Sequence, residues 1–144
     1  MKKFIFLLAL PLLAISCKKD EDQTSTCSIN KNTVAGNYII TATKYKASST
    51  DAEQDWFSSM TQCKKDDTYQ LKNDGTVVVG DGTDVCPGPP PPGTITAWSI
   101  SADGKVFTLD DTYNVSSFDC TNLVVTKKDF LVPGDIKTVT YSKN

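Results

Sequence analysis

Alternation of apolar and polar positions marks most of the chain beyond residue 35. In the stretch 94–101, Trp98 and Ile100 point to one side, whereas the small and polar residues between them point to the other. Residues 68–72 repeat this alternation. A period of two is that of a strand with one face buried. We therefore expect both stretches to be half-buried strands, with Trp98 as the largest residue of the core.

Eight short strands follow from this alternation and from the turn residues between them. The expected strands are residues 36–45, 68–72, 76–79, 94–101, 105–109, 113–118, 121–127 and 136–141. The Asn-Asp-Gly sequence at 73–75 is a strong hairpin signal between two of them. Sequential antiparallel hairpins lose their exposed edges when the sheet closes on itself. We predict an all-β fold, a small antiparallel up-and-down β-barrel of about eight strands, with a β-sandwich as the alternative.

Helical periodicity is confined to two short stretches. Residues 31–35 predict a turn of helix that closes one end of the fold. In the first long loop, Asp51 begins a sequence typical of a capping box, and Ala52, Trp56 and Met60 then recur at helical spacing. We predict a short helix here. Its apolar stripe either plugs the barrel as part of the core or covers the mouth as a lid over a ligand, and such stripes favour the plug.

The N-terminal segment has the pattern of a lipoprotein signal peptide. Two lysines precede an apolar run over residues 4–15, which is too short to span a bilayer but typical of a signal-peptide core. The run ends in Leu-Ala-Ile-Ser-Cys, which resembles a lipobox, the sequence cleaved before a lipidated cysteine. We expect a signal peptide over residues 1–16 and lipidation of Cys17, whose acyl chains would attach the protein to a membrane.

A polar segment without periodicity follows the predicted lipidation site. We expect residues 17–30 to form the lipidated cysteine and a flexible tether, and residues 31–144 to form the barrel domain. The Lys-Lys-Asp-Glu-Asp tract at 18–22 is similar to the surface-export signals of some Gram-negative lipoproteins, and a solvated tether explains it equally well. The expected location is the outer membrane, lipid-anchored and exposed at the cell surface, with a periplasm-facing orientation as the alternative.

Four cysteines remain after Cys17, and they are Cys27, Cys63, Cys86 and Cys120. An even number of cysteines in an exported chain predicts disulfides, here two. Three pairings are possible. No Cys-x-x-Cys pair and no histidine is present to fix the tetrahedral geometry of a zinc site.

A resemblance to a known family rests on the stretch 63–76. This stretch joins a cysteine, an acidic pair, a short alternating strand and an Asp-Gly turn, and it resembles the lipocalin-like domain of small bacterial lipoproteins. The resemblance implies a barrel that holds a small apolar ligand. It also implies a disulfide between Cys63 and Cys86, with Cys27 and Cys120 as the other pair.

Composition and charge exclude several classes of function. The 15 basic residues are all lysine, histidine is absent and the formal net charge is −2. Nucleic acid is therefore disfavoured as a partner, and so is ordinary acid–base catalysis near neutral pH. No nucleophile elbow or phosphate loop is present, and Asp81 and Asp84 lack the spacing of a calcium loop. We predict a protein that is not an enzyme and has no metal or cofactor.

The most favoured function is binding without catalysis. If the barrel holds a small apolar ligand, the candidate contacts are its aromatic and methionine residues, Tyr38, Trp56, Phe57, Met60, Tyr69 and Trp98. The alternatives are a surface module that binds a protein or glycan, such as an inhibitor-type barrel, and a structural envelope lipoprotein with a plugged barrel. The proline run at 87–92 is interpreted as a stiff, exposed loop.

Overall fold

The computed structural model describes residues 27–87 and 96–144. In chain order, its elements are α1 (Lys31–Val34), β1 (Gly36–Lys46), β2 (Gln54–Asp55), α2 (Gln62–Lys65), β3 (Thr68–Leu71), β4 (Thr76–Gly80), β5 (Thr96–Ile100), β6 (Val106–Leu109), β7 (Asp111–Phe118), β8 (Asn122–Lys128) and β9 (Ile136–Lys143). The eight longer strands match the eight strands that the alternation predicts, to within a few residues at each end.

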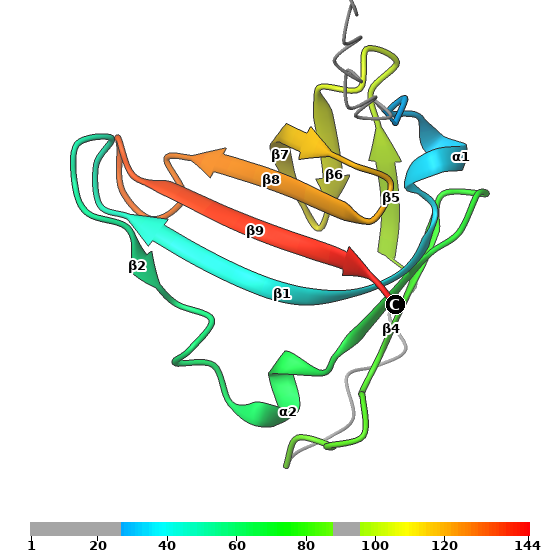
Figure 1. Ribbon diagram of the computed structural model, residues 1–144, viewed down its shortest axis with the longest axis horizontal. Helices are drawn as coiled ribbons and strands as arrows, with labels where there is room; N and C mark the ends of the chain where they lie inside the picture. Colours follow the sequence, from blue (N-terminus) through cyan, green and yellow to red (C-terminus); the bar gives the residue numbers. More distant parts are fainter. Residues whose placement is uncertain (1–26, 88–95) are drawn as a thin grey trace, which may run out of the picture.

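The strands form one antiparallel sheet that closes into a ring. Neighbours in the sheet follow the order β2-β1-β3-β4-β5-β6-β7-β8-β9, and β9 pairs back with β1. The closing pair is long, because it runs from Tyr38 opposite Lys143 to Lys46 opposite Ile136, and Figure 1 shows β1 and β9 side by side along their length. The ring confirms the predicted all-β, up-and-down architecture in place of the β-sandwich.

The core fills one end of the ring, which we call the closed end. Tyr38 is fully buried there, and its hydroxyl donates to the Val34 carbonyl at 2.6 Å. Trp98 is 2% exposed and donates from Nε1 to the Lys72 carbonyl at 2.7 Å. Trp98 is therefore a core residue, as its place in the alternation predicts.

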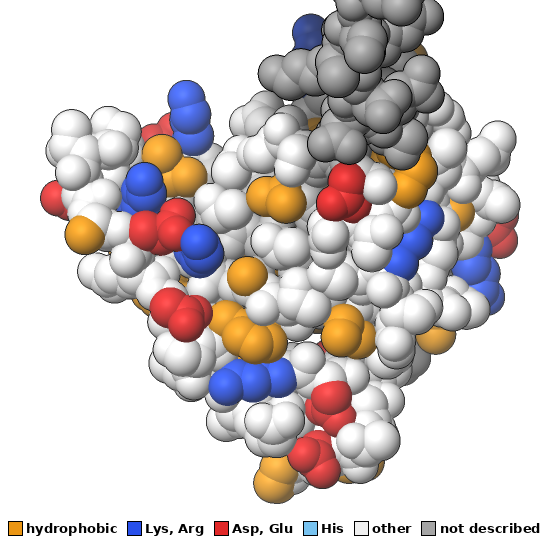
Figure 2. Space-filling model, in the orientation of Figure 1, with side chains coloured by type: hydrophobic (Ala, Val, Ile, Leu, Met, Phe, Trp, Pro, Cys, Tyr) orange, Lys and Arg blue, Asp and Glu red, His pale blue; other side chains and the backbone are white. Residues whose placement is uncertain are grey.

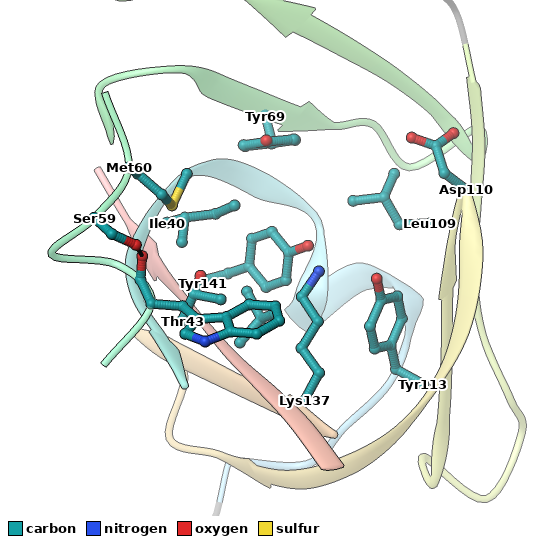
Figure 3. Close-up of a pocket in the computed structure, with 12 residues that line it drawn as sticks. Ile40, Thr43, Ser59, Met60, Tyr69, Leu109, Asp110, Tyr113, Lys137 and Tyr141 are labelled. Carbon is teal, nitrogen blue, oxygen red and sulfur yellow. Dashed lines mark hydrogen bonds between the residues drawn. The ribbon is translucent and has the colours of Figure 1, made fainter. Parts of the chain in front are cut away.

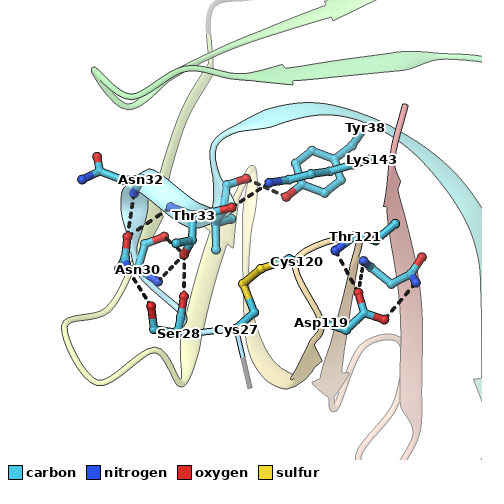
Figure 4. The surroundings of a disulfide bond; sticks show 12 residues. Cys27, Ser28, Asn30, Asn32, Thr33, Tyr38, Asp119, Cys120, Thr121 and Lys143 are labelled. Carbon is cyan, nitrogen blue, oxygen red and sulfur yellow. Dashed lines mark hydrogen bonds between the residues drawn. A yellow bond between two sulfur atoms is a disulfide. The ribbon is translucent and has the colours of Figure 1, made fainter. Parts of the chain in front are cut away.

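Helix α1 covers the closed end and is held there by its caps and by a disulfide (Figure 4). The Asn30 side chain accepts from the amides of Asn32 and Thr33, as an N-cap does. The Lys143 ammonium donates to the Thr33 carbonyl at 2.7 Å, which joins the last strand to this helix.

The disulfide at the closed end joins Cys27 to Cys120, with 5.4 Å between their Cα atoms. Because Cys27 is cross-linked and Ile29 packs against the core, the folded part includes residues 27–30. The prediction of a flexible tether up to residue 30 is wrong for these four residues. The rest of that tether, the signal peptide and Cys17 lie outside the described residues.

The predicted helix of residues 52–60 does not form. Gln54 and Asp55 instead make strand β2, which pairs with Tyr45 and Lys44 of β1, because backbone partners on the edge of β1 compete with the local helical pattern. The first long loop does contain a short helix, but it is α2, further along the chain.

A second disulfide, between Cys63 and Cys86, joins α2 to the segment that follows β4. Both disulfides therefore have the pairing that the lipocalin-like resemblance implies. Beside this disulfide, the Asp66 carboxylate accepts from the Asp84 amide at 2.8 Å and the Thr83 hydroxyl at 3.1 Å. Asp66 thus has a structural role in this corner, where it holds the chain after β4 against the start of β3.

Candidate functional site

A cavity of about 480 Å³ lies within the ring. This volume falls in the range of about 300–1,000 Å³ that small-molecule sites occupy. The lining residues are Ile40, Thr43, Trp56, Ser59, Met60, Tyr69, Leu109, Asp110, Tyr113, Lys137, Val139 and Tyr141. Figure 3 shows the labelled side chains arranged around a common space. They are mainly apolar and aromatic, with one lysine and one aspartate.

Strand direction places the cavity at the end of the ring opposite α1. Strand β9 starts beside the cavity at Lys137 and ends at Lys143, which bonds to α1. Strand β6 begins after Gly104, which approaches Ile29 at the closed end, and finishes at Leu109 in the cavity wall. The ring therefore has a packed end and a hollow end.

Strand β2 positions Trp56 at the cavity. The Trp56 amide donates to the Thr43 carbonyl of β1 at 2.9 Å, and the indole stacks on the Tyr45 ring with 4.2 Å between centroids. The next lining residue of this segment, Met60, is a flexible apolar side chain that adapts to irregular shapes. The segment therefore supplies one fixed aromatic surface and one adaptable contact.

Three tyrosines supply hydroxyl groups to the cavity. Tyr69 and Tyr141 meet edge to face at 5.7 Å between centroids, and Tyr113 lies across from Tyr141 (Figure 3). Burial raises the pKa of all three, and nearby carboxylates raise it further. They are therefore neutral hydrogen-bond donors near neutral pH.

Within the described part of the chain, these three hydroxyls donate no hydrogen bond to another protein group. Among residues 27–87 and 96–144, the tyrosine hydroxyls that donate hydrogen bonds are those of Tyr38 and Tyr45. The cavity tyrosines therefore keep their donors for a ligand or water.

Lys137 extends from β9 into the cavity (Figure 3). Its ammonium lies 4.3 Å from the Phe130 ring centroid, a cation–π contact. Burial lowers the pKa of Lys137, Asp111 opposes this effect, and Lys127 adds to it. Lys127 itself forms an ion pair with Asp111. Within the described ranges, Lys137 has neither a carboxylate partner nor a hydrogen-bond acceptor.

Asp135 fixes the loop that carries Phe130. The Asp135 carboxylate is fully buried and accepts from the amides of Phe130, Leu131 and Val132 at 2.6, 2.9 and 3.1 Å. The Tyr45 hydroxyl donates to it at 3.0 Å. Because Tyr45 also stacks on Trp56, this carboxylate links the β8–β9 loop to the aromatic wall of the cavity.

The structure brings together only part of the predicted binding set. Trp56, Met60 and Tyr69 line the cavity. Tyr38 and Trp98 belong instead to the packed core of the closed end. Their side chains are enclosed by protein and do not line this cavity.

Phe57 is also absent from the cavity lining. The Lys65 ammonium lies 5.3 Å from its ring centroid. The lid-or-plug stripe is therefore divided, with Trp56 and Met60 in the wall and Phe57 outside it. The stripe does not fill the hollow end of the ring.

Several lining residues were not among those predicted, above all Lys137, Tyr113 and Tyr141. A signal for Lys137 and Tyr141 was present, because they alternate with polar positions in strand β9 and share a face with Val139. A lysine at an inward position of such a strand is a candidate site residue. Tyr113 likewise occupies a buried position in β7, between the exposed residues Thr112 and Asn114.

The acidic corner beside the Cys63–Cys86 disulfide is a separate feature. Asp67 is 7% exposed, and burial raises its pKa, opposed by Lys64, whose ammonium lies 3.6 Å away. In the part of the chain that the structure describes, no three acidic or cysteine side chains are arranged to hold a metal ion.

The comparisons leave the family open. No protein-family model, curated protein or solved structure matches this chain. Over residues 27–87 and 96–144, no helix has the length and apolar character needed to cross a membrane.

Proposed function

We propose that this protein is an extracytoplasmic lipoprotein of the lipocalin-like kind that binds a small apolar ligand without catalysis. The observation that carries the proposal is the hollow end of the ring, a cavity of about 480 Å³ lined mainly by apolar and aromatic side chains. A closed eight-stranded sheet can hold one small ligand. Burial of apolar ligand surface in such a site is favourable by roughly 25 cal/mol per Å².

The proposed location is a membrane surface reached through a lipid on Cys17, with the outer membrane and cell-surface exposure as the favoured setting. Two disulfides in a chain of this size support an oxidising compartment outside the cytoplasm. The signal-peptide pattern of residues 1–16 supports export. Mass spectrometry of the purified protein tests both, because cleavage and acylation at Cys17 change the mass by defined amounts.

Ligand binding is tested by calorimetric titration of the oxidised protein with dodecanol, a neutral single-chain probe. We expect Trp56→Ala to weaken the binding of dodecanol by about tenfold or more, because the indole is a fixed part of the cavity wall. Phe57→Ala is the matched control, since it removes the neighbouring aromatic ring, which lies outside the lining.

Two results would count against a ligand-binding cavity. One is the absence of binding heat with dodecanol, together with no small molecule retained by the protein in native mass spectrometry. The other is equal weakening by Trp56→Ala and Phe57→Ala, which would indicate a site outside the cavity.

A surface that binds a protein or a glycan is the second candidate function. Leu131 and Val132 are 61% and 51% exposed on the β8–β9 loop, and Val85 is 66% exposed after β4. Figure 2 shows acidic and basic side chains interspersed on the face in view. This mixture favours no partner of one charge sign. Replacing Leu131 and Val132 with serine would abolish capture of such a partner while leaving dodecanol binding unchanged.

A further inference from the structure

We infer that the ligand of the cavity is a single-chain carboxylate, with its head group held by the Lys137 ammonium and its chain against the apolar wall. This inference rests on the proposed function, because it uses the same cavity. It adds a ligand class, an orientation and a residue that selects between charged and neutral ligands.

The first step is the unmatched positive charge. Lys127 forms an ion pair with Asp111, whereas Lys137 has no ion-pair partner among the described residues. Its ammonium lies 4.3 Å from the Phe130 ring centroid, and the Asp111 charge acts on it only from beyond ion-pair distance. A partly buried ammonium without an anion is costly, and an anionic ligand removes that cost. The Lys137 ammonium is therefore the group of this lining with which a negative charge on a ligand would pair.

The second step is the set of donors beside that charge. Figure 3 shows the Lys137 amine between the rings of Tyr141 and Tyr113. A carboxylate has two oxygens and about four lone-pair directions. It can therefore accept from the ammonium and from tyrosine hydroxyls at the same time. An alcohol or an ester offers fewer acceptor positions and no charge.

The third step is the orientation of the ligand. Asp110 is the other ionic residue of the lining, and Figure 3 shows it across the cavity from Lys137. Its negative charge repels a carboxylate on that side and so directs the head group toward Lys137. The wall formed by Ile40, Leu109 and Val139 is then left to the alkyl chain.

The fourth step limits the charge of the ligand to one. Among the described residues, Lys137 is the single cation of the lining, and the sequence contains no arginine. A dianionic head group, such as a phosphate monoester, would keep one charge uncompensated in the same cavity as Asp110. A carboxylate matches the available charge, and a bidentate guanidinium site of the kind that suits phosphate is absent from the sequence.

The test compares ligands of equal chain length on the oxidised full-length protein by calorimetry at neutral pH. Dodecanoate is expected to bind more tightly than dodecanol, and dodecyl phosphate more weakly than dodecanoate. Lys137→Met keeps an apolar side chain of similar length but removes the charge. We expect it to weaken dodecanoate binding by about tenfold to a hundredfold, as for a lost charge-assisted contact, and to lower the ratio of dodecanoate to dodecanol affinity.

Two variants make the test specific. Lys128→Met removes one exposed positive charge at the end of β8, outside the lining, and is expected to leave the ratio of dodecanoate to dodecanol affinity unchanged. Asp110→Asn removes the opposing charge and is expected to strengthen dodecanoate binding, which raises the ratio of dodecanoate to dodecanol affinity. Circular dichroism melts establish that each variant is folded.

The outcomes separate this inference from the proposed function. If dodecanol and dodecanoate bind equally and Lys137→Met changes neither, the carboxylate assignment is overturned and the apolar cavity stands. Tighter binding of dodecyl phosphate than of dodecanoate also overturns the assignment. If no single-chain probe binds the wild-type protein, the proposed function fails together with this inference.

Discussion

At the scale of single residues, Asp135 is fully buried, and its carboxylate accepts four hydrogen bonds. Burial alone would raise the pKa of Asp135, but the amides of Leu131, Val132 and Phe130 and the Tyr45 hydroxyl outweigh burial and hold this pKa below its ordinary value. The native state therefore binds a proton at this carboxylate less readily than the unfolded chain does. Its contribution to stability is present above the unfolded pKa, about 3.9 for an aspartate, and is lost as the pH falls through the lower native pKa.

The first prediction concerns this carboxylate. We expect Asp135→Asn to lower the melting temperature by several degrees at pH 7, because the amide presents one acceptor oxygen where three backbone amides and a hydroxyl now donate. The difference from the wild type is expected to shrink as the pH is lowered toward 3. Circular dichroism melts across this pH range measure both effects.

The matched control is Asp51→Asn, which makes the same chemical change at an exposed carboxylate. It is expected to leave the melting temperature within about a degree of the wild-type value at every pH. A constant difference between Asp135→Asn and the wild type from pH 7 to pH 3 would contradict the assigned pKa direction.

The sequence predicted some of the apolar residues that line the cavity, but it did not predict the charged residue Lys137. Trp56, Met60 and Tyr69 were predicted because they are large and apolar in positions that suggested burial. Lys137 was missed because a lysine in a strand is usually interpreted as solvent-facing. The alternation places it on one face with Val139 and Tyr141, but the ring is needed to show that this face points into the cavity. Which charges pair also depends on neighbouring strands, and the Lys127–Asp111 pair joins β8 to β7.

At the scale of elements, the β3–β4 hairpin depends on one glycine. Gly75 has a φ of +94°, in the left-handed region that side chains disfavour by roughly 1–2 kcal/mol. A Cβ at this position would also lie 2.9 Å from the Lys31 ammonium and 3.5 Å from the Trp98 carbonyl oxygen. The turn therefore combines a backbone requirement with close contact to the closed end.

The second prediction compares this glycine with another of similar backbone geometry. Gly134 has a φ of +91°, but a Cβ there would meet no atom within 4 Å. Gly134→Ala is expected to reduce the free energy of unfolding by about 1–2 kcal/mol through backbone strain alone. Gly75→Ala is expected to cost more than this. Equilibrium urea unfolding measures both free energies. An equal loss of free energy in the two variants would show that the atoms near Gly75 move away from the added Cβ without cost.

Elements could be predicted where local pattern and tertiary structure agree. The alternation in residues 96–100 and the Asn-Asp-Gly turn at 73–75 both specify the local structure observed. The stripe at Ala52, Trp56 and Met60 predicted a helix that does not form, because Trp56 makes its contacts outside this segment. Trp56 stacks on Tyr45, and its amide bonds to Thr43. These partners belong to β1 and leave no trace in the local sequence.

At the scale of the whole molecule, the two disulfides close loops of different length. Cys27 and Cys120 are 93 residues apart, whereas Cys63 and Cys86 are 23 apart. Because a longer closed loop removes more conformational entropy from the unfolded chain, the first disulfide should contribute more to stability.

The third prediction follows from this difference. We expect replacement of Cys27 and Cys120 by alanine to reduce the free energy of unfolding by roughly 4–5 kcal/mol, and replacement of Cys63 and Cys86 by roughly 3–3.5 kcal/mol. Urea unfolding of the two double variants under identical conditions tests the order. The unreduced wild-type protein is expected to take up no thiol reagent at these four positions. A larger loss from the shorter loop would contradict the chain-entropy argument.

The Cys27–Cys120 bond also determines how the molecule carries mechanical load. A pull on the chain before Cys27, such as a membrane anchor would exert, does not reach β1 first, because it passes through the covalent bond to Cys120 between β7 and β8. Strand β1, whose long pairing with β9 closes the ring, is therefore spared from being peeled away one hydrogen bond at a time. The tension enters at the packed end, and the hollow end with its cavity remains unloaded.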